Sequence, residues 1–267
     1  MASDKTAIGL SGNVLKIIAA ITMLIDHVGI ILLPELAAFR IIGRISFPIY
    51  AYMIAEGCHY TRNKLRYFAG IFLLGVVCQT VYSLQSDDKY LGILITFSVS
   101  IIVVYAMQYM KWSFVSERAL SERVLSLLLF SSLVVGVYFL NKYLTIDYGF
   151  FGCMAPAFAA AFKMPRTSKK ESPSFENDEK INTRPKIFAF FGNDFLKDRL
   201  VNVISLGICL LFLALNMPGQ HQMLALLALP LLLLYSGKRG KLKMKYFFYI
   251  FYPLHLAVLE GISMLID

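Results

Sequence analysis

The chain has 267 residues, of which 58% are hydrophobic and 16% charged, and its formal net charge is +9. Soluble proteins use about 45–50% apolar residues, so this composition argues against an ordinary soluble globular protein. The surplus of Lys and Arg suits either nucleic acid or an anionic membrane surface, and the positions of these residues decide between the two.

Nine apolar stretches follow one another along the chain, and most approach the roughly 20 residues that a helix needs to cross a bilayer. The first is too long for the apolar core of a signal peptide and has no small-residue cleavage site behind it, so we expect it to be retained. The sixth and eighth are short. The predicted spans are 14–33, 38–58, 66–84, 91–110, 120–140, 146–162, 200–216, 221–236 and 246–265.

The basic residues fall on one side of this predicted topology. If the amino end is cytoplasmic, every Lys and Arg outside the spans is cytoplasmic except Lys89 and Lys142, while Arg40 and Arg44 lie inside the second span. Such a bias is typical of cytoplasmic loops in membrane proteins. The sequence therefore predicts an all-α polytopic transmembrane helical bundle of about nine spans. Its amino end is cytoplasmic and its carboxyl end extracytoplasmic, in the plasma or inner membrane, and no nucleic-acid partner is predicted.

A polar segment divides the predicted bundle into two parts. Residues 164–199 carry many charges and several prolines and cannot bury much apolar surface. We interpret them as a mobile cytoplasmic linker between a six-span part, 1–163, that holds the candidate active site and a three-span part, 200–267, that completes the bundle.

Several ionisable residues lie inside the predicted spans, where they are costly and often functional. Asp26 and His27 lie beyond the middle of the first span, and Arg40 and Arg44 lie one helical turn apart in the second. His255 lies near the middle of the last span. A rise of about 1.5 Å per residue places these groups in one layer between the midplane and the outer leaflet, which predicts a catalytic chamber.

Structural interpretations of the same residues remain open. Asp26 with Arg44 would also serve as a buried ion pair, and His27 as a packing histidine that faces away from Asp26. His255, after Tyr252 and Pro253, would also suit a helix kink without chemistry.

Five stretches together resemble the TraX family of membrane acetyltransferases, named for the protein that acetylates the amino end of conjugative pilin. They are LKIIAAITMLIDHVG (15–29), FRIIGRISFPIYAYMIAEGCHYTRNKLRY (39–67), CQTVYSL (78–84), IDYGFFGCMAP (146–156) and YFFYIFYPLHL (246–256). The family is similar, more remotely, to the membrane acyltransferases that O-acetylate cell-surface sugars.

This resemblance implies acetyl transfer from acetyl-CoA, without a metal, to a peptide, glycan or lipid acceptor. Such a reaction needs a base for the acceptor proton and donors for the developing oxyanion. His27 is the first candidate for the base and His255 is the alternative. Asp26 would orient His27. Arg44, helped by Arg40, would hold the thioester carbonyl or the donor phosphates.

The remaining candidates are expected to bind the acyl donor or the substrate. Arg62, Asn63 and Lys64, ordered by Glu56, would hold the nucleotide end of coenzyme A at the cytoplasmic rim. The full set of binding candidates is Arg40, Glu56, Thr61, Arg62, Asn63, Gln79, Tyr82, Asp147 and Tyr252. A transporter and a non-catalytic assembly factor for surface structures are the alternative functions, because intramembrane Asp, His and Arg also serve proton relays.

Overall fold

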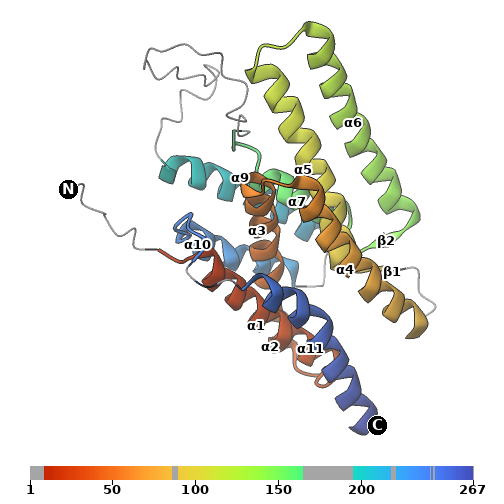
Figure 1. Ribbon diagram of the computed structural model, residues 1–267. Helices are drawn as coiled ribbons and strands as arrows, with labels where there is room; N and C mark the ends of the chain where they lie inside the picture. The colour runs from red at the N-terminus through yellow and green to blue at the C-terminus, as the bar shows by residue number, and fades with distance from the viewer. Residues whose placement is uncertain are drawn as a thin grey trace.

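The computed structural model describes residues 9–85, 90–164, 195–217, 221–240, 242 and 244–266, and it is built almost entirely of helices (Figure 1). The α-helices are α1 (Gly12–Ile31), α2 (Ala37–Gly43), α3 (Ser46–Tyr60), α4 (Lys64–Gln85), α5 (Ile93–Val115), α6 (Leu120–Tyr143), α7 (Gly149–Ala159), α9 (Phe195–Asn216), α10 (Ala228–Leu233) and α11 (Lys245–Ile266). A 3-10 helix, η2 (Gln222–Leu227), precedes α10. Two short strands, β1 (Tyr90–Leu91) and β2 (Thr145–Ile146), pair in parallel.

Six helices, α1, α4, α5, α6, α9 and α11, are long and apolar enough to cross a membrane. The prediction of an all-α bundle with several membrane-spanning helices is therefore confirmed, with six candidate spans among the described residues in place of nine. The cytoplasmic placement of the amino end stays a prediction. The predicted linker 164–199 falls almost entirely outside the described residues, and α9 begins at Phe195, ahead of the expected start at residue 200.

The other three predicted spans are not single long helices. The sixth corresponds to α7, whose 11 residues extend about 16 Å, too short for a hydrocarbon core of about 30 Å. The eighth is divided between η2 and α10. The second is divided between α2 and α3.

Pro48 accounts for the break between α2 and α3. In a continuous helix its nitrogen would donate to the carbonyl of Arg44, but proline has no N–H and its ring crowds that carbonyl. The helix accordingly ends at Gly43 and restarts at Ser46. Arg44 is the C-terminal cap of α2, so the break sets the position of its side chain.

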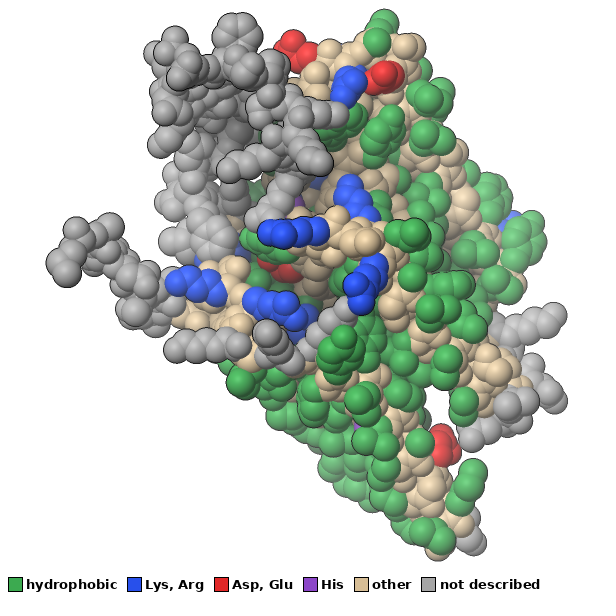
Figure 2. Space-filling view, in the orientation of Figure 1, with side chains coloured by type: hydrophobic (Ala, Val, Ile, Leu, Met, Phe, Trp, Pro, Cys, Tyr) green, Lys and Arg blue, Asp and Glu red, His purple; other side chains and the backbone are tan. Residues whose placement is uncertain are grey.

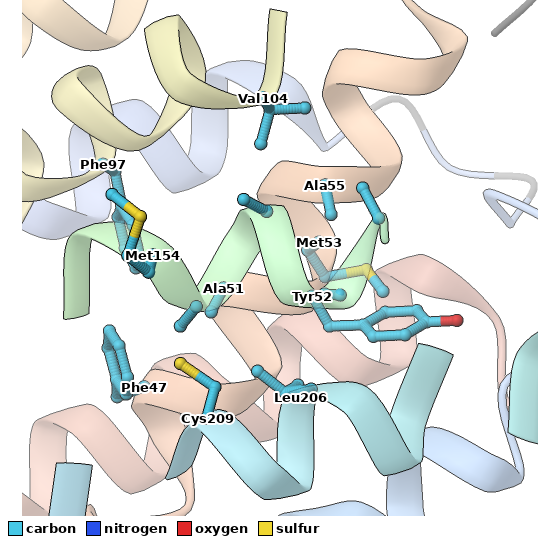
Figure 3. Packing of buried hydrophobic residues seen from close by; sticks show 14 of the residues in the cluster. Phe47, Ala51, Tyr52, Met53, Ala55, Phe97, Val104, Met154, Leu206 and Cys209 are labelled. Atoms are coloured by element: carbon cyan, nitrogen blue, oxygen red, sulfur yellow. The ribbon is translucent and has the colours of Figure 1, made fainter. Parts of the chain in front are cut away.

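The core is centred on α3, which α1, α5, α7 and α10 surround (Figure 1). Figure 3 shows Tyr52 and Ala51 of α3 packed among side chains from α5, α7 and α9. Small residues of α7, among them Ala155 and Ala157, allow this close approach, as is usual between helices in membranes. The short α7 is therefore a core helix that supports the central α3.

The outer helices present apolar side chains to their surroundings. On α4, Leu73 and Val77 are exposed, and on α6, Leu128 and Val135 are exposed. In Figure 2 such side chains cover much of the visible face of the outer helices. This pattern suits a lipid environment, because hydrocarbon chains accept apolar side chains without a solvation cost.

Candidate functional site

A cavity of about 1460 Å³ runs beside α1, from Gly12 in its first turn to Ile31 at its last residue. Residues of α2, α3, α4 and α11 form most of the remaining wall. Ligand sites usually enclose about 300–1,000 Å³, so this cavity has room for two substrates end to end. We name its end near Gly12 the basic end, where Lys16 and Arg239 lie, and its other end the histidine end.

Two histidines from opposite ends of the chain meet at the histidine end. The Nδ1 atom of His27 lies 2.8 Å from the carbonyl oxygen of Met23, one turn earlier in α1. His255 repeats this arrangement in α11, with Nδ1 2.8 Å from the carbonyl oxygen of Phe251. The Nε2 atom of His255 is 3.4 Å from Nδ1 of His27, and the ring centroids are 4.9 Å apart.

The protonation pattern of this pair follows from its partners. A carbonyl oxygen only accepts hydrogen bonds, so Nδ1 carries the hydrogen in each neutral ring. His255 Nε2 is then an acceptor facing the Nδ1–H of His27. The unprotonated Nε2 of His27 makes no hydrogen bond within the described part of the chain.

The two histidines differ in their access to the cavity. His27 lines it, whereas His255 is only 6% exposed and is not part of the wall. The ring of Phe251 stacks on His255 with centroids 5.0 Å apart. His27 is therefore the histidine available to a ligand, and His255 supports it from behind.

Asp26 makes an ion pair with α2. Its Oδ2 lies 3.1 Å from Nη1 of Arg40, and its side chain packs directly against Gly43. Neighbouring helix residues face different directions, which is why Asp26 contacts α2 while His27 contacts α11. Of the two roles expected for Asp26, orienting His27 or holding an arginine, the structure places it in contact with an arginine.

Arg44 lies in the cavity wall at the break between α2 and α3, with only 5% of its surface exposed. Its buried Nε has no hydrogen-bond partner among the described residues. The charges of Asp26 and Asp147 are close enough to interact with it. A buried guanidinium with a free N–H is a strong donor for an anionic or carbonyl oxygen.

Asp147 and Gln79 fix the wall around the short strands. The hydroxyl of Tyr90 hydrogen-bonds the carboxylate of Asp147. The amide of Gln79 donates to the Tyr90 carbonyl oxygen at 2.6 Å and accepts from the Gly92 N–H at 3.0 Å. Both polar atoms of the Gln79 side chain are thus used by the backbone. All these residues line the cavity, as do Tyr82 and Tyr252.

Glu56 is buried near the basic end, with 6% of its surface exposed. It is ion-paired with Lys163 and accepts a hydrogen bond from the hydroxyl of Tyr235 at 3.3 Å. Thr61 also lines the cavity. Neither Lys163 nor Tyr235 carried a signal in the sequence, because their link to Glu56 depends on how distant helices pack.

Arg62, Asn63 and Lys64, expected to bind the donor nucleotide, lie outside the cavity wall. Arg62 is exposed, and the Asn63 side chain accepts from the N–H of Arg66 at 2.8 Å, which caps the start of α4. At the basic end, the Lys and Arg residues that do line the wall are Lys16 and Arg239. The sequence spacing could have pointed to Lys16, because this residue lies about three helical turns before His27 on the same face of α1.

The close contact of Gly43 with Asp26 yields a stability prediction. A Cβ at residue 43 would lie 2.2 Å from Cβ of Asp26, so Gly43→Ala must push α2 away from α1. We expect a loss of about 1–3 kcal/mol, typical of overpacking, seen as a lower unfolding temperature in detergent. The matched control is Gly136→Ala in α6, where a Cβ meets nothing within 4 Å and alanine favours the helix. Equal unfolding temperatures for the two variants would contradict this packing.

Comparison with known proteins yields a family and two relatives. The family model described as "TraX protein" matches residues 11–174 and 187–263. A "Probable fimbrial assembly protein FimC, serogroup H1" of Dichelobacter nodosus is 25% identical over 272 residues, which covers 97% of this chain and 98% of that protein. An uncharacterized protein of Rickettsia prowazekii (strain Madrid E) is 40% identical over 67 residues, a quarter of each chain. No solved structure gives a significant match.

The family match covers most of the chain and includes the residues of both ends of the cavity. It agrees with the resemblance carried by the five sequence stretches. The chain belongs to the TraX family.

Proposed function

We propose that this protein is an integral-membrane acyltransferase that moves an acetyl group from acetyl-CoA to an amine or hydroxyl of an acceptor at the membrane or cell surface. The observation that carries the proposal is the histidine end of the cavity. There the hydrogen bond at Nδ1 of His27 leaves its Nε2 to act as the acceptor, and a second histidine stands behind it. Arg44, whose Nε has no hydrogen-bond partner among the described residues, lies in the same wall.

His27 acts as the general base in this mechanism. The acceptor nitrogen or oxygen forms a bond with the thioester carbonyl carbon while its proton passes to Nε2 of His27. The carbonyl electron pair moves onto oxygen. The Nδ1–H of the resulting imidazolium is shared between the Met23 carbonyl oxygen at 2.8 Å and His255 Nε2 at 3.4 Å, and both acceptors stabilise its positive charge.

Arg44 stabilises the negative charge that develops on the carbonyl oxygen. Its guanidinium is already buried and fixed at the helix break, so it needs no reorganisation when the charge appears. When the intermediate collapses, the carbon–sulfur bond breaks. The departing thiolate takes the proton from His27, which restores the neutral histidine and releases the free thiol of coenzyme A.

The mechanism has the two substrates enter the cavity from its opposite ends. The donor enters from the basic end, which we place in the cytosol because coenzyme A is charged and cannot cross a bilayer. The acceptor reaches the histidine end from the other side of the membrane. In this proposal the protein resides in a plasma or inner membrane and has its amino end in the cytosol.

The acceptor belongs to a surface structure in this proposal. The name of the Dichelobacter nodosus relative refers to fimbrial assembly, and the family resemblance implies acetylation of pilin. A peptide amine is therefore the first candidate, ahead of a glycan hydroxyl or a lipid. The same name favours one alternative, a non-catalytic assembly factor, because it mentions assembly and no chemical reaction.

The direct test is to incubate the purified full-length protein in lipid nanodiscs with acetyl-CoA and to measure free thiol with a chromogenic disulfide. We expect thiol release that rises when a peptide with a free amino end is added, and acetylation of that peptide by mass spectrometry. An amino-blocked peptide is the control. Binding of acetyl-CoA without thiol release for any peptide, glycan or lipid acceptor would favour the assembly factor.

A further inference from the structure

We propose that the basic end of the cavity, formed by Lys16 and Arg239, binds the phosphate groups of the nucleotide-bearing thioester donor. This inference rests on the proposed function and assigns the donor a site that differs from the one expected at Arg62 and Asn63.

Backbone contacts hold Arg239 over the first turn of α1. The N–H of Gly12 donates to the carbonyl oxygen of Lys238 at 2.9 Å, and the N–H of Asn13 donates to that of Arg239 at 3.0 Å. The Asn13 side chain also donates to the carbonyl oxygen of Leu242 at 2.7 Å. The segment around Arg239 is therefore attached to α1, and its side chain forms part of the cavity rim.

Lys16 extends the same positive surface one turn further along α1. Its stem is partly buried, and its Nζ lies 5.8 Å from the centre of the Phe248 ring. The charge of Arg239 is near enough to repel that of Lys16. In Figure 2, Lys and Arg side chains gather about a hollow on the visible face. Two cations thus share one end of the cavity.

Neither cation has a carboxylate partner in the part of the chain that the structure describes. The buried carboxylate of this end, Glu56, is already ion-paired with Lys163. Lys16 is partly buried and Arg239 is exposed. Like charges that lie close together repel one another, and a counter-ion that binds between them relieves this repulsion. An anion with several negative oxygens, such as a diphosphate, satisfies both side chains at once.

The distance from Lys16 to His27 matches the length of the donor's arm. The two residues are on the same face of α1, and eleven residues of helix rise about 16 Å. The pantetheine arm between phosphate and sulfur has about twelve bonds and extends about 14 Å, if three backbone bonds of a peptide span about 3.5 Å. A diphosphate held at Lys16 therefore brings the thioester within reach of His27 and Arg44, with the flexible lysine side chain covering the small difference.

The test measures binding of coenzyme A to the full-length protein in zwitterionic nanodiscs by titration calorimetry. We expect Lys16→Gln and Arg239→Gln each to weaken the binding of coenzyme A by about 10- to 100-fold, the usual effect of losing one charged hydrogen bond. Pantetheine, which lacks the phosphates, should bind all variants equally. The matched control is Lys238→Gln, since Lys238 is exposed in the same loop but does not line the cavity.

The outcomes separate this inference from the proposed function. If Lys16→Gln and Arg239→Gln bind coenzyme A as tightly as the unchanged protein while thiol release persists, the phosphate site is wrong and the enzyme stands. If they weaken binding but no acceptor is ever acetylated, the site stands and the enzyme is wrong. Equal weakening by Lys238→Gln overturns the site. The site is also overturned if Lys16→Gln and Arg239→Gln bind coenzyme A normally but lose binding of phosphatidylglycerol in anionic nanodiscs. The two cations would then hold a lipid headgroup.

Discussion

Replacing His27 with glutamine is expected to lower the rate of acetyl transfer by about 10²–10⁴-fold, the usual contribution of a general base. Glutamine keeps polarity and approximate size but cannot take up a proton. The affinity for coenzyme A should stay within about twofold, because His27 is at the far end of the cavity from Lys16. Single-turnover transfer and calorimetric binding on the same nanodisc sample measure the two quantities.

The control is another histidine outside the cavity. His221 is exposed and has a φ of 53°, so His221→Asn suits its left-handed backbone and should leave transfer unchanged. His255→Phe should retain the stacking on Phe251 but lose the second acceptor that faces the His27 Nδ1–H beside the Met23 carbonyl oxygen. We expect it to lower the rate by about tenfold, with partial recovery in His255→Gln. If His255→Phe removes all activity while His27→Gln does not, the base is His255.

Replacing Arg44 with glutamine is expected to lower kcat by about 10²–10³-fold with little change in KM for acetyl-CoA. Loss of one oxyanion donor has an effect of this size in other acyl-transfer enzymes. The different effects on kcat and KM follow from the positions of the residues. Arg44 faces the reacting carbonyl in the proposed mechanism, while Lys16 and Arg239 hold the phosphates. Arg44→Lys should recover only part of the rate, since an ammonium lacks the fixed fork of a guanidinium.

Arg123 provides the matched control for Arg44. It also has a buried Nε without a hydrogen-bond partner among the described residues, but it is on α6 and does not line the cavity. Arg123→Gln should therefore leave kcat unchanged. An increase in KM for acetyl-CoA with unchanged kcat in Arg44→Gln would instead move the donor phosphates to Arg44 and contradict the assignment of the two ends.

The two arginines of the second predicted span illustrate how helix breaks create a site. The sequence places Arg40 and Arg44 one turn apart on one face. In the structure, Arg40 pairs with Asp26, whereas Arg44 follows the end of α2 and keeps a free Nε in the cavity wall. The interruption at Pro48 therefore separates a structural arginine from one that is available to a ligand.

The length of each apolar stretch predicted correctly that it forms helix, but it did not show which helices are long enough to cross a membrane. The long stretches became α1, α4, α5, α6, α9 and α11. The stretch that became α7 is apolar for another reason, since it packs inside the bundle against α3. The η2–α10 pair packs one face against α3 and leaves Met223, Leu227 and Leu233 exposed. A buried core helix and a lipid-facing helix are equally apolar, so composition cannot separate them.

The sequence by itself determined which residues are polar within apolar helices and on which face each lies, because helix periodicity fixes direction. The sequence singled out His27, Arg44 and His255 as candidates in this way, and its spacing places Lys16 on the same helix face as His27. Only the tertiary structure decided the partners: His27 meets His255 from 228 positions away, and Arg239 joins Lys16 through backbone bonds to the start of α1. Contacts between helices distant in the chain depend on how their surfaces pack, and periodicity within one helix carries no information about its neighbour.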